Sequence, residues 1–595
     1  MSTAEDVADA RPAIGARPVW IALGAATIAF HLWLVAAGLV PNLVARPIHM
    51  ALAIPWVALY VRGPSVSGAI LTVVGVSACL YIAINHASLA DQYGMVFGPV
   101  QTVVAFALLA VTLELARRAI GWPLPLVALA ALLYAFFGEL IPGHFGHAGI
   151  PDASLLGTLT VAEGGLWGQL TGISVGVVAV FVIFGAVLNA GEAGAGFMNV
   201  AAAAAGRLKA GAAKVSVLSS ALFGSISGSA SANVASTGAV TLPAMRGLGY
   251  PRHLAGAVEA VASSGGQIMP PLMGAGAFVM VELTGTPYDA IVLAALPAAV
   301  LYFFAVWIGI DAFATRYSLK GLPPEERPAA RTVVVTSLFF MVPFTILLVA
   351  MFGLGYTPQY AAALAIIAGA ALLLFDGSLR FSVRHAGARL AKAALVAGEQ
   401  VAVIASIILC ASLVVGVLGM TGLGVKVTSL ILSGAGGALW PALLLTALAC
   451  LILGMEVPTT AAYVICVAVA GPALIDLGLE PLHAHLFVFW YALLSTITPP
   501  VCGAVFIAAG MVEEKWLKVA GAAMALGVGL YLIPLAMVST PGLLGLQTAP
   551  LIAVLGMVKA GAGLAAVSWG IIARGNLIWR LGLVAGGLTI ILWPA

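Results

Sequence analysis

Charged residues are scarce in this chain: Asp, Glu, Lys and Arg together make up 8% of its 595 residues, and 62% of the residues are hydrophobic. A soluble globular protein carries about 25% charged residues. The few charges stand in short clusters between apolar runs of roughly 20 residues, the length that crosses about 30 Å of hydrocarbon. The composition therefore predicts an all-α polytopic membrane protein that is surrounded by a lipid bilayer and has no nucleic-acid partner.

Sequence signatures of catalysis and of nucleotide binding are also absent. The chain has no GxxxxGK[ST] phosphate loop, no GxSxG nucleophile motif and no HExxH zinc motif. Its five cysteines lie in apolar segments without CxxC spacing, which is typical of small buried hydrophobic residues. We therefore expect no enzyme, no cofactor and no direct ATP drive, which leaves an ion gradient as the energy source for transport.

The apolar runs define the expected spans. The first follows a polar stretch, residues 1–17, and is too long for a signal peptide, so we expect it to be retained. We expect hairpins at 215–246 and 439–475 and interrupted spans at 253–284 and 484–511. The remaining spans are expected near residues 18–40, 47–61, 66–84, 98–116, 122–140, 172–192, 289–312, 332–352, 359–377, 396–419, 517–537, 550–573 and 577–594.

Positive charges orient these spans. With the N-terminus in the cytoplasm, all 25 Lys and Arg residues lie on the cytoplasmic side except Arg46, Lys426 and Lys559, as the positive-inside rule requires. This distribution holds only if the hairpin at 215–246 enters and leaves on the cytoplasmic side and the hairpin at 439–475 on the outer side. The sequence thus predicts two re-entrant hairpins of opposite orientation.

Two stretches of the chain are similar to each other. Duplicated apolar segments interrupted by Gly and Pro are the best sequence indication of a secondary transporter whose site lies between the repeats. Because the hairpins have opposite orientation, we predict inverted-topology repeats over residues 122–312 and 359–537, each with one re-entrant hairpin and one discontinuous helix. The matching positions are Pro243 with Pro472, Gly249 with Gly478, Pro270-Pro271 with Pro499-Pro500, and Gly274-Ala275 with Gly503-Ala504.

The middle of each hairpin, residues 225–233 and 454–460, is rich in small and polar residues. Such runs are poor helix interiors and good tips. Unpaired carbonyls at membrane depth are tolerated where they line a cavity, and there they can hold Na⁺ while helix N-termini and hydroxyls hold a carboxylate. Close helix packing by small residues is the alternative. The candidates are Ser225, Gly228, Gly454 and Glu456 for the cation, and Ser227, Ser229, Asn233, Thr459 and Thr460 for the substrate.

Pro-Pro pairs interrupt the two discontinuous spans, within residues 263–273 and 495–503. Proline removes a backbone donor and clashes with the preceding turn, so both helices should unwind there. Freed oxygens at Gly265, Gly266, Thr496 and Thr498 are candidate cation ligands, and Gln267 and Thr498 are candidate substrate contacts. A purely structural kink is the alternative.

Ionisable groups within the membrane are costly and point to function. Glu456, in the second tip, could carry a proton, ligate a cation or pair with a neighbour. Glu259 lies near the cytoplasmic end of the first interrupted span, and we expect it to pair with the Arg246/Arg252 region.

Three motifs resemble a known family. Residues 257–278 are similar to a signature of the fused permeases of tripartite ATP-independent periplasmic (TRAP) transporters, and so are residues 224–233 and 458–463. More narrowly, the chain resembles the 4TM/12TM fusion class that works with TAXI-type periplasmic binding proteins. The resemblance covers roughly residues 1–540.

This resemblance implies an elevator-type transporter in a bacterial or archaeal cytoplasmic membrane. Residues 1–119 would be a four-helix scaffold module, 120–540 the large transport subunit, and 541–595 an extension of two helices. The family imports organic acids that a periplasmic receptor delivers, driven by a cation gradient, usually of Na⁺. The pattern at the second tip is Gly-Met-Gly-x-Pro in that family, whereas this chain has Glu456, so the coupling ion is Na⁺ or H⁺.

Two other functions fit the sequence less well. A receptor-independent organic-anion symporter of similar fold would not need the four-span N-terminal module. A membrane-embedded enzyme or redox subunit would need a His/Asp/Glu constellation inside the spans, and the sequence has none. We therefore expect a cation-coupled importer of small organic anions.

Overall fold

The computed structural model describes residues 17–270, 272–454 and 459–594. Within these residues every regular element is a helix, apart from one isolated bridge between Phe375 and Phe381. Twelve helical segments in this part of the chain are long and apolar enough to cross a membrane. The predicted all-α polytopic fold is therefore confirmed.

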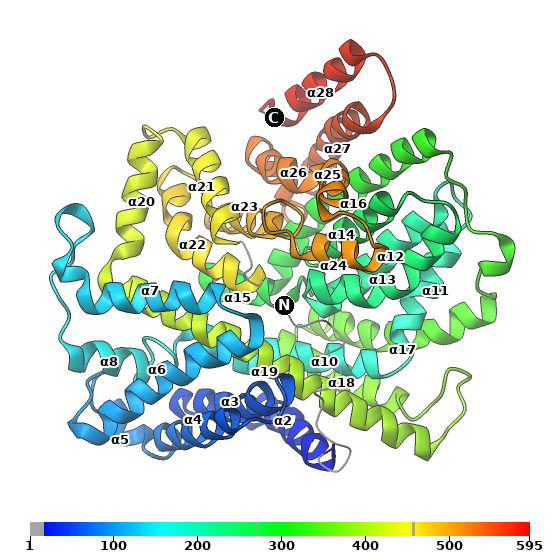
Figure 1. Ribbon diagram of the computed structural model, residues 1–595. Helices are drawn as coiled ribbons and strands as arrows, with labels where there is room; N and C mark the ends of the chain where they lie inside the picture. The colour runs from blue at the N-terminus through cyan, green and yellow to red at the C-terminus, as the bar shows by residue number, and fades with distance from the viewer. Residues whose placement is uncertain (1–16, 271, 455–458, 595) are drawn as a thin grey trace.

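The N-terminal helices form a layer of their own, at the bottom of Figure 1. They match the four spans predicted between residues 18 and 116. The helices are α2 (Arg17–Ala37), α3 (Asn42–Pro55) with its π-helical extension η2 (Trp56–Val61), α4 (Val66–Ile84), α5 (His86–Ala90) and α6 (Gly98–Ile120). The Ser65 side chain caps α4 by accepting a hydrogen bond from the Gly68 N–H (3.1 Å).

The residues of the two predicted repeats share one series of elements: a short helix, a hairpin and an interrupted helix. The first contains α7 (Pro123–Phe137), α8 (Asp152–Thr160), α9 (Gln169–Ile173), η5 (Ser174–Val178), α10 (Ala179–Ala190), α11 (Ala193–Ala205), α12 (Gly211–Ser227), α13 (Ala230–Gly247), α14 (Arg252–Gly266), α15 (Gly274–Thr284) and α16 (Tyr288–Tyr317). After α17 (Ala330–Leu348) and η7 (Val349–Gly353), the second contains α18 (Pro358–Leu372), α19 (Val383–Thr421), α20 (Leu423–Gly434), α21 (Leu439–Leu453), α22 (Thr459–Asp476), α23 (Pro481–Leu493), η8 (Leu494–Thr496), α24 (Gly503–Val512), α25 (Trp516–Leu526) and α26 (Val528–Ser539).

Both hairpins and both interrupted helices occur where the sequence predicts them. The hairpins are the contacting pairs α12–α13 and α21–α22, and the interrupted helices are α14–α15 and α23–α24. The repeats also interlock, because α13 of the first hairpin packs on α24 and α22 of the second hairpin packs on α15. Each hairpin therefore packs on the interrupted helix of the other repeat.

Three features of the helices differ from the sequence prediction. The sequence predicts no span at α11 and α20, the helices that precede the two hairpins, because their 13 and 12 residues are too short to cross a membrane. α19 is a single helix of 39 residues that begins at Val383, well before the predicted start at 396. The first turns of α19 carry basic residues, so the hydrophobicity of the sequence does not predict a membrane span there. One of them, Arg389, donates to Glu192 Oε1 beyond the end of α10 (2.6 Å).

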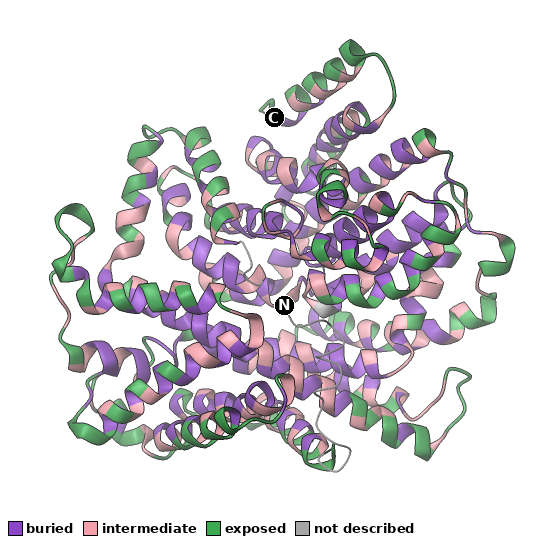
Figure 2. Cartoon of the chain, in the orientation of Figure 1, coloured by how far each residue is buried: buried purple, intermediate pink, exposed green. Residues whose placement is uncertain are grey.

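α19 joins the N-terminal layer to the repeats. One hydrophobic cluster contains side chains of α2–α6, α7 and α8 together with Ala402, Ala405 and Leu409 of α19, while a second cluster holds the repeats and other residues of the same helix. Figure 2 shows the buried residues concentrated in the middle of the molecule. The long helix is therefore shared by both cores.

Glycines allow the N-terminal layer to approach α19 closely. A Cβ on Gly24 of α2 would lie 2.1 Å from the Ala394 carbonyl oxygen, and a Cβ on Gly398 would lie 2.2 Å from Trp56 Cζ2. A buried polar chain adds to this junction, because His31 Nε2 lies 2.8 Å from His49 Nδ1 and His49 Nε2 lies 3.0 Å from Ser174 Oγ. Both kinds of contact hold the N-terminal layer against the helices that lead to the cavity described below.

Gly398→Ala is expected to destabilise this junction. Trp56 is fully buried, so its ring cannot move aside for the added methyl group, and overpacking of a core costs about 1–3 kcal/mol. We expect a lower melting temperature of the detergent-purified protein. Gly387→Ala in the same helix is the matched control, because its Cβ would meet no atom within 4 Å. Equal melting temperatures for the two variants would contradict the junction described here.

The last two helices lie on the side opposite to the N-terminal layer (Figure 1). α27 (Pro550–Ile572) packs on α16 and on α26, and α28 (Leu577–Leu592) packs on α27 and α26. Within α27, Lys559 Nζ donates to Thr540 Oγ1 (2.9 Å) and to the Trp593 carbonyl. The extension therefore covers the final helices of both repeats.

Candidate functional site

The two hairpin tips and the two helix breaks meet at one cavity of about 630 Å³. On one side its wall comes from the α12–α13 tip, the break between α14 and α15, the start of α22 and the break between α23 and α24. On the other side the wall comes from α6, η5, α10 and α19. Pockets of this size take small organic ligands.

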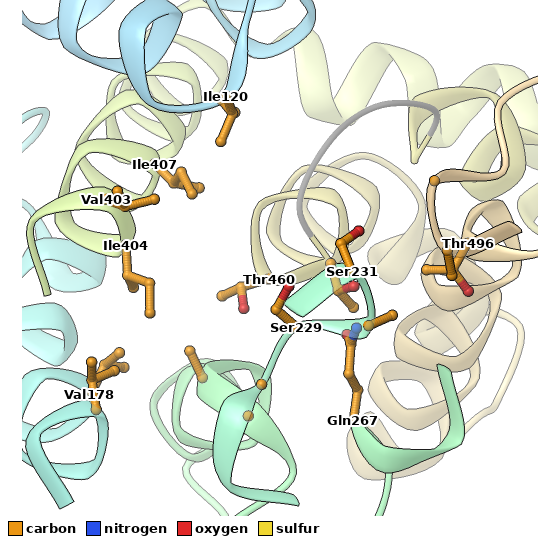
Figure 3. Close-up of a pocket in the computed structure, with 18 of the residues that line it drawn as sticks. Ile120, Val178, Ser229, Ser231, Gln267, Val403, Ile404, Ile407, Thr460 and Thr496 are labelled. Atoms are coloured by element: carbon orange, nitrogen blue, oxygen red, sulfur yellow. The ribbon is translucent and has the colours of Figure 1, made fainter. Parts of the chain in front are cut away.

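The two sides of the cavity differ in polarity, as Figure 3 shows. The hairpins and the interrupted helices contribute hydroxyl and amide groups from Ser229, Ser231, Gln267, Thr460 and Thr496. The opposite wall is apolar and comprises Ile120, Val178, Phe181, Val182, Val403, Ile404, Ile407 and Ile408. Among the described lining residues there is no charged side chain. A ligand would therefore be recognised on one side and only contacted by hydrocarbon on the other.

Three helices start at the cavity within the described residues. α13 begins at Ala230, α15 at Gly274 and α24 at Gly503, and each of these residues lines the cavity, as does Thr459, the first described residue of α22. The first N–H groups of a helix lack a partner within the helix, and the helix dipole places partial positive charge there. The two repeats thus direct three described N-termini at one space. This arrangement can bind a carboxylate or sulfonate without an arginine or lysine.

The predicted site residues that line the cavity come from both repeats. They are Gly228, Ser229, Gln267, Gly454, Thr459, Thr460 and Thr496. The Ser229 side chain also caps α13, because its Oγ accepts from the Ala232 N–H (3.3 Å). Thr496 Oγ1 lies 2.8 Å from Ser264 Oγ and 2.7 Å from the Leu493 carbonyl oxygen. These seven remain candidate contacts for substrate or cation.

Asn233 and Thr498 lie outside the cavity lining and face neighbouring helices instead. Asn233 is fully buried, and its Nδ2 donates to the Ser220 carbonyl (2.9 Å) and the Ser263 carbonyl (3.4 Å). Thr498 Oγ1 lies 2.7 Å from the hydroxyl of Tyr531 on α26. Their hydrogen bonds position the first hairpin and the second break behind the cavity.

Gly265, Gly266 and Ser225 also lie outside the lining. The Gly265 carbonyl accepts from the Ile268 N–H (3.2 Å), and the Gly266 carbonyl from the Met269 N–H (3.3 Å), so both oxygens take part in the turn that ends α14. Ser225 Oγ donates to the Leu222 carbonyl (2.8 Å). The side chain of Ser227, and Glu456 as a whole, lie outside the described residues.

The two glycines at the end of α14 permit close packing. A Cβ on Gly265 would lie 2.1 Å from Tyr302 Cε1, and a Cβ on Gly266 would lie 2.6 Å from Gly224 Cα of the first hairpin. At the tip, Gly228 (φ +62°) and Gly274 (φ +61°) face each other, and a Cβ on either would lie 3.0–3.1 Å from the other's Cα. The hairpin and the interrupted helix are therefore in contact backbone to backbone beside the cavity.

The expected pairing of Glu259 with the Arg246/Arg252 region is wrong. Glu259 is fully buried, and its carboxyl group accepts from Ser216 Oγ (2.7 Å) and from the hydroxyls of Thr237 and Thr241. Arg252 instead pairs with Glu513 (3.5 Å). The helical path of α14 carries Glu259 away from the basic end and into the space between the hairpin helices.

Sequence reasoning missed some of the residues at the site. Ser231 and Ser495 line the cavity, and each stands within a segment identified as a tip or a break. The sequence indicates Gly274 and Gly503 only as matching positions of the repeats. The signal for their role was available, because each follows a proline-induced break and so must start a new helix.

Comparison with protein families identifies the chain. Residues 106–552 match the tripartite ATP-independent periplasmic transporter, DctM component. The chain belongs to this family. The match begins within α6, ends early in α27, and includes both hairpins and the whole cavity wall. DctM proteins are membrane transporter permeases, and the family is not an enzyme family.

Two relatives agree with this assignment. The C4-dicarboxylate TRAP transporter large permease protein DctM of Pseudomonas aeruginosa is 26% identical over 328 residues, which are 54% of this chain and 73% of that protein. The isethionate TRAP transporter permease protein DctMQ of Oleidesulfovibrio alaskensis is 26% identical over 431 residues, which are 67% of this chain and 65% of that protein. The resemblance to fused TRAP permeases is thereby confirmed.

Proposed function

We propose that this TRAP permease is a cation-coupled secondary importer of small organic anions that a periplasmic solute-binding protein of the TAXI type delivers. The observation that supports it most is the cavity, which has hydroxyl groups and three described helix N-termini on one side and carries no charged side chain among its described residues. Such a site suits a carboxylate or sulfonate. The relatives named for C4-dicarboxylate and isethionate transport handle anions of these two kinds.

The apolar wall supports an elevator movement. Val403, Ile404 and Ile407 of α19 belong to the helix that is fastened to the N-terminal layer, whereas the polar half belongs to the hairpins and interrupted helices. Hydrocarbon surfaces form no directional bonds, so the polar half can slide past them without losing hydrogen bonds. In this proposal the N-terminal layer and α19 form the scaffold, and the hairpins and interrupted helices carry the substrate.

A coupling Na⁺ would bind beside the substrate. α12 ends at the cavity near Gly228, α14 near Gln267 and α21 near Gly454. Helix C-termini present carbonyl oxygens and partial negative charge, which suit a cation. Cation and anion would then reinforce each other's binding in one space.

The face of the permease that the positive-inside rule places outside the cell carries more acidic than basic side chains. Its two cations are engaged: Arg46 pairs with Glu163 (3.4 Å), and Lys426 Nζ donates to the Gly146 carbonyl (2.6 Å). The exposed acids there are Asp91, Glu139, Asp152, Glu163, Glu282, Asp476 and Glu480. We expect the receptor to dock through a basic surface, so that its docking weakens as salt screens the charges.

Receptor dependence is the test of this function. The purified permease in proteoliposomes, under an imposed cation gradient, should take up labelled succinate or isethionate only when the cognate receptor is present, and uptake should fall as ionic strength rises. Uptake of equal rate without receptor would contradict the proposal and indicate a receptor-independent organic-anion symporter of similar fold.

A further inference from the structure

Glu259 is a carboxylic acid enclosed by hydroxyl groups inside the hairpin region. It lies on α14 between α12 and α13 and is fully buried. Ser216 Oγ donates to Oε2 (2.7 Å), and Ser220 Oγ and Ser263 Oγ each lie 3.4 Å from Oε1. The hydroxyls of Thr237 and Thr241 complete the enclosure.

Within the described residues no cation pairs with this carboxyl group. The helices packed on α14 carry their charges elsewhere: Lys214 of α12 binds Asp311 of α16 (2.7 Å), and Lys518 of α25 binds Glu514 (3.5 Å). Arg246 and Arg316 stand exposed near the ends of α13 and α16, and Arg252 and His253 stand in the first turn of α14. Burying an unpaired charge is costly, so a buried carboxyl without a counter-ion readily takes up a proton.

The hydroxyl protons around Glu259 can serve either protonation state. Thr237 Oγ1 lies 2.8 Å from the Asn233 carbonyl oxygen as well as next to Oε1, and Thr241 Oγ1 lies 3.1 Å from the Thr237 carbonyl oxygen as well as next to Oε2. Each threonine hydroxyl thus has one proton to donate and two acceptor oxygens within reach, one on Glu259 and one on the backbone of α13. With Glu259 ionised, both threonines donate to it.

With Glu259 protonated, its own O–H donates to one threonine oxygen, and that threonine turns its proton to the carbonyl of its own helix. Apart from the proton gained by Glu259, the two states differ only by rotation of one threonine hydroxyl group. Each buried polar group stays hydrogen-bonded in both states, so neither state carries the cost of an unsatisfied donor or acceptor. This property suits a group that must bind and release a proton in every cycle.

Glu259 is also linked to the cavity by the helix that bears it. α14 continues past Glu259 to its end at Gly266, and the next residue, Gln267, lines the cavity. At a rise of about 1.5 Å per residue, Gln267 lies about 12 Å along the helix axis from Glu259. A negative charge at that distance in a protein interior weakens the binding of an anion by roughly tenfold. Loss of that charge on protonation removes the repulsion.

We propose that Glu259 is the proton-binding site that couples transport to a proton gradient. One proton binds to a carboxylate oxygen when the carrier faces the side of higher proton concentration, an organic anion then binds in the cavity, and both leave on the other side. The proposal rests on the proposed function, and it places the coupling proton apart from the tip residues predicted from sequence.

The test compares Glu259→Gln with Glu513→Gln in proteoliposomes that contain labelled succinate or isethionate, receptor and no Na⁺. In the wild type and in Glu513→Gln, an imposed pH gradient, acidic outside, should drive accumulation. Glu259→Gln has nearly the shape of the protonated glutamate but cannot release a proton. It should lose accumulation by about tenfold or more, as expected when the only coupling step available without Na⁺ is removed. It should still exchange labelled for unlabelled substrate at equal pH on both sides.

Two results would overturn the proposal: accumulation by Glu259→Gln that follows the pH gradient as in the wild type, or wild-type accumulation that needs Na⁺ and ignores pH. Thr241→Val provides a second variant in case Glu259→Gln fails to fold. It removes a donor to the ionised carboxylate, so the pH profile of uptake should move to higher pH, and an unchanged profile would also count against the proposal. Uptake by the wild type is also measured with and without receptor. That comparison tests the proposed function, and the Glu259 variants test the proton site, so failure of one claim is distinguishable from failure of the other.

Discussion

Gly266→Ala is expected to abolish uptake while membrane insertion stays intact. The added Cβ would lie 2.6 Å from Gly224 Cα and 2.7 Å from the Ser220 carbonyl oxygen, both of which are backbone atoms of α12. Backbone cannot give way as a flexible side chain can, so the first hairpin must move off the end of α14. Overpacking of about 1–3 kcal/mol would then separate the tip from the break that forms the cavity, with a loss of uptake of about tenfold or more.

The measurement is receptor-delivered uptake in proteoliposomes, normalised to the amount of inserted protein. Gly510→Ala is the matched control, because this glycine also lies in a helix of the interrupted spans and its Cβ would meet no atom within 4 Å. Uptake by Gly266→Ala at the level of Gly510→Ala would show that close contact between hairpin and helix is not needed for transport.

Ile407→Glu is expected to eliminate uptake of organic anions. Ile407 lies on the apolar wall of the cavity, opposite Thr460, Ser229 and Ser231 (Figure 3). A carboxylate on this wall would place negative charge in a space where α13, α15 and α24 present their N-termini. It would both repel the substrate and compete with it for those N–H groups, and two like charges about 4 Å apart repel by several kcal/mol in a protein interior.

Ile407→Gln separates charge from size, because glutamine has nearly the same shape as glutamate and no charge. It should retain much more uptake than Ile407→Glu, with a raised KM for the receptor-delivered anion. If the two variants lose uptake equally, the cavity does not hold the anion and the helix N-termini have another role.

The architecture of the repeats could be predicted from sequence because its signals are local. Pro-Pro pairs break helices wherever they occur, and a glycine- and serine-rich tip between two apolar stretches favours a turn. α11 and α20 could not be predicted as spans because they are too short. The start of α19 could not be predicted because its first turns are basic and precede the apolar run.

The division of the candidate residues between cavity and scaffold could not be predicted, because it depends on which side of a helix faces which neighbour. Gln267 and Gly266 are adjacent in the chain, yet one lines the cavity and the other packs on Gly224. Glu259 shows the same limit. Glu259 and its partners form polar pairs spaced by four residues, a pattern that indicates a shared polar face. The pairs are Ser216 with Ser220, Thr237 with Thr241, and Glu259 with Ser263.

Gradient-driven accumulation is the central claim, and it is tested most directly by the level of labelled succinate or isethionate that proteoliposomes reach with receptor present. Under an imposed cation gradient we predict that the internal concentration rises above the external one and falls back when an ionophore dissipates the gradient. Uptake that only equilibrates, and that is unchanged by the ionophore, would contradict the account.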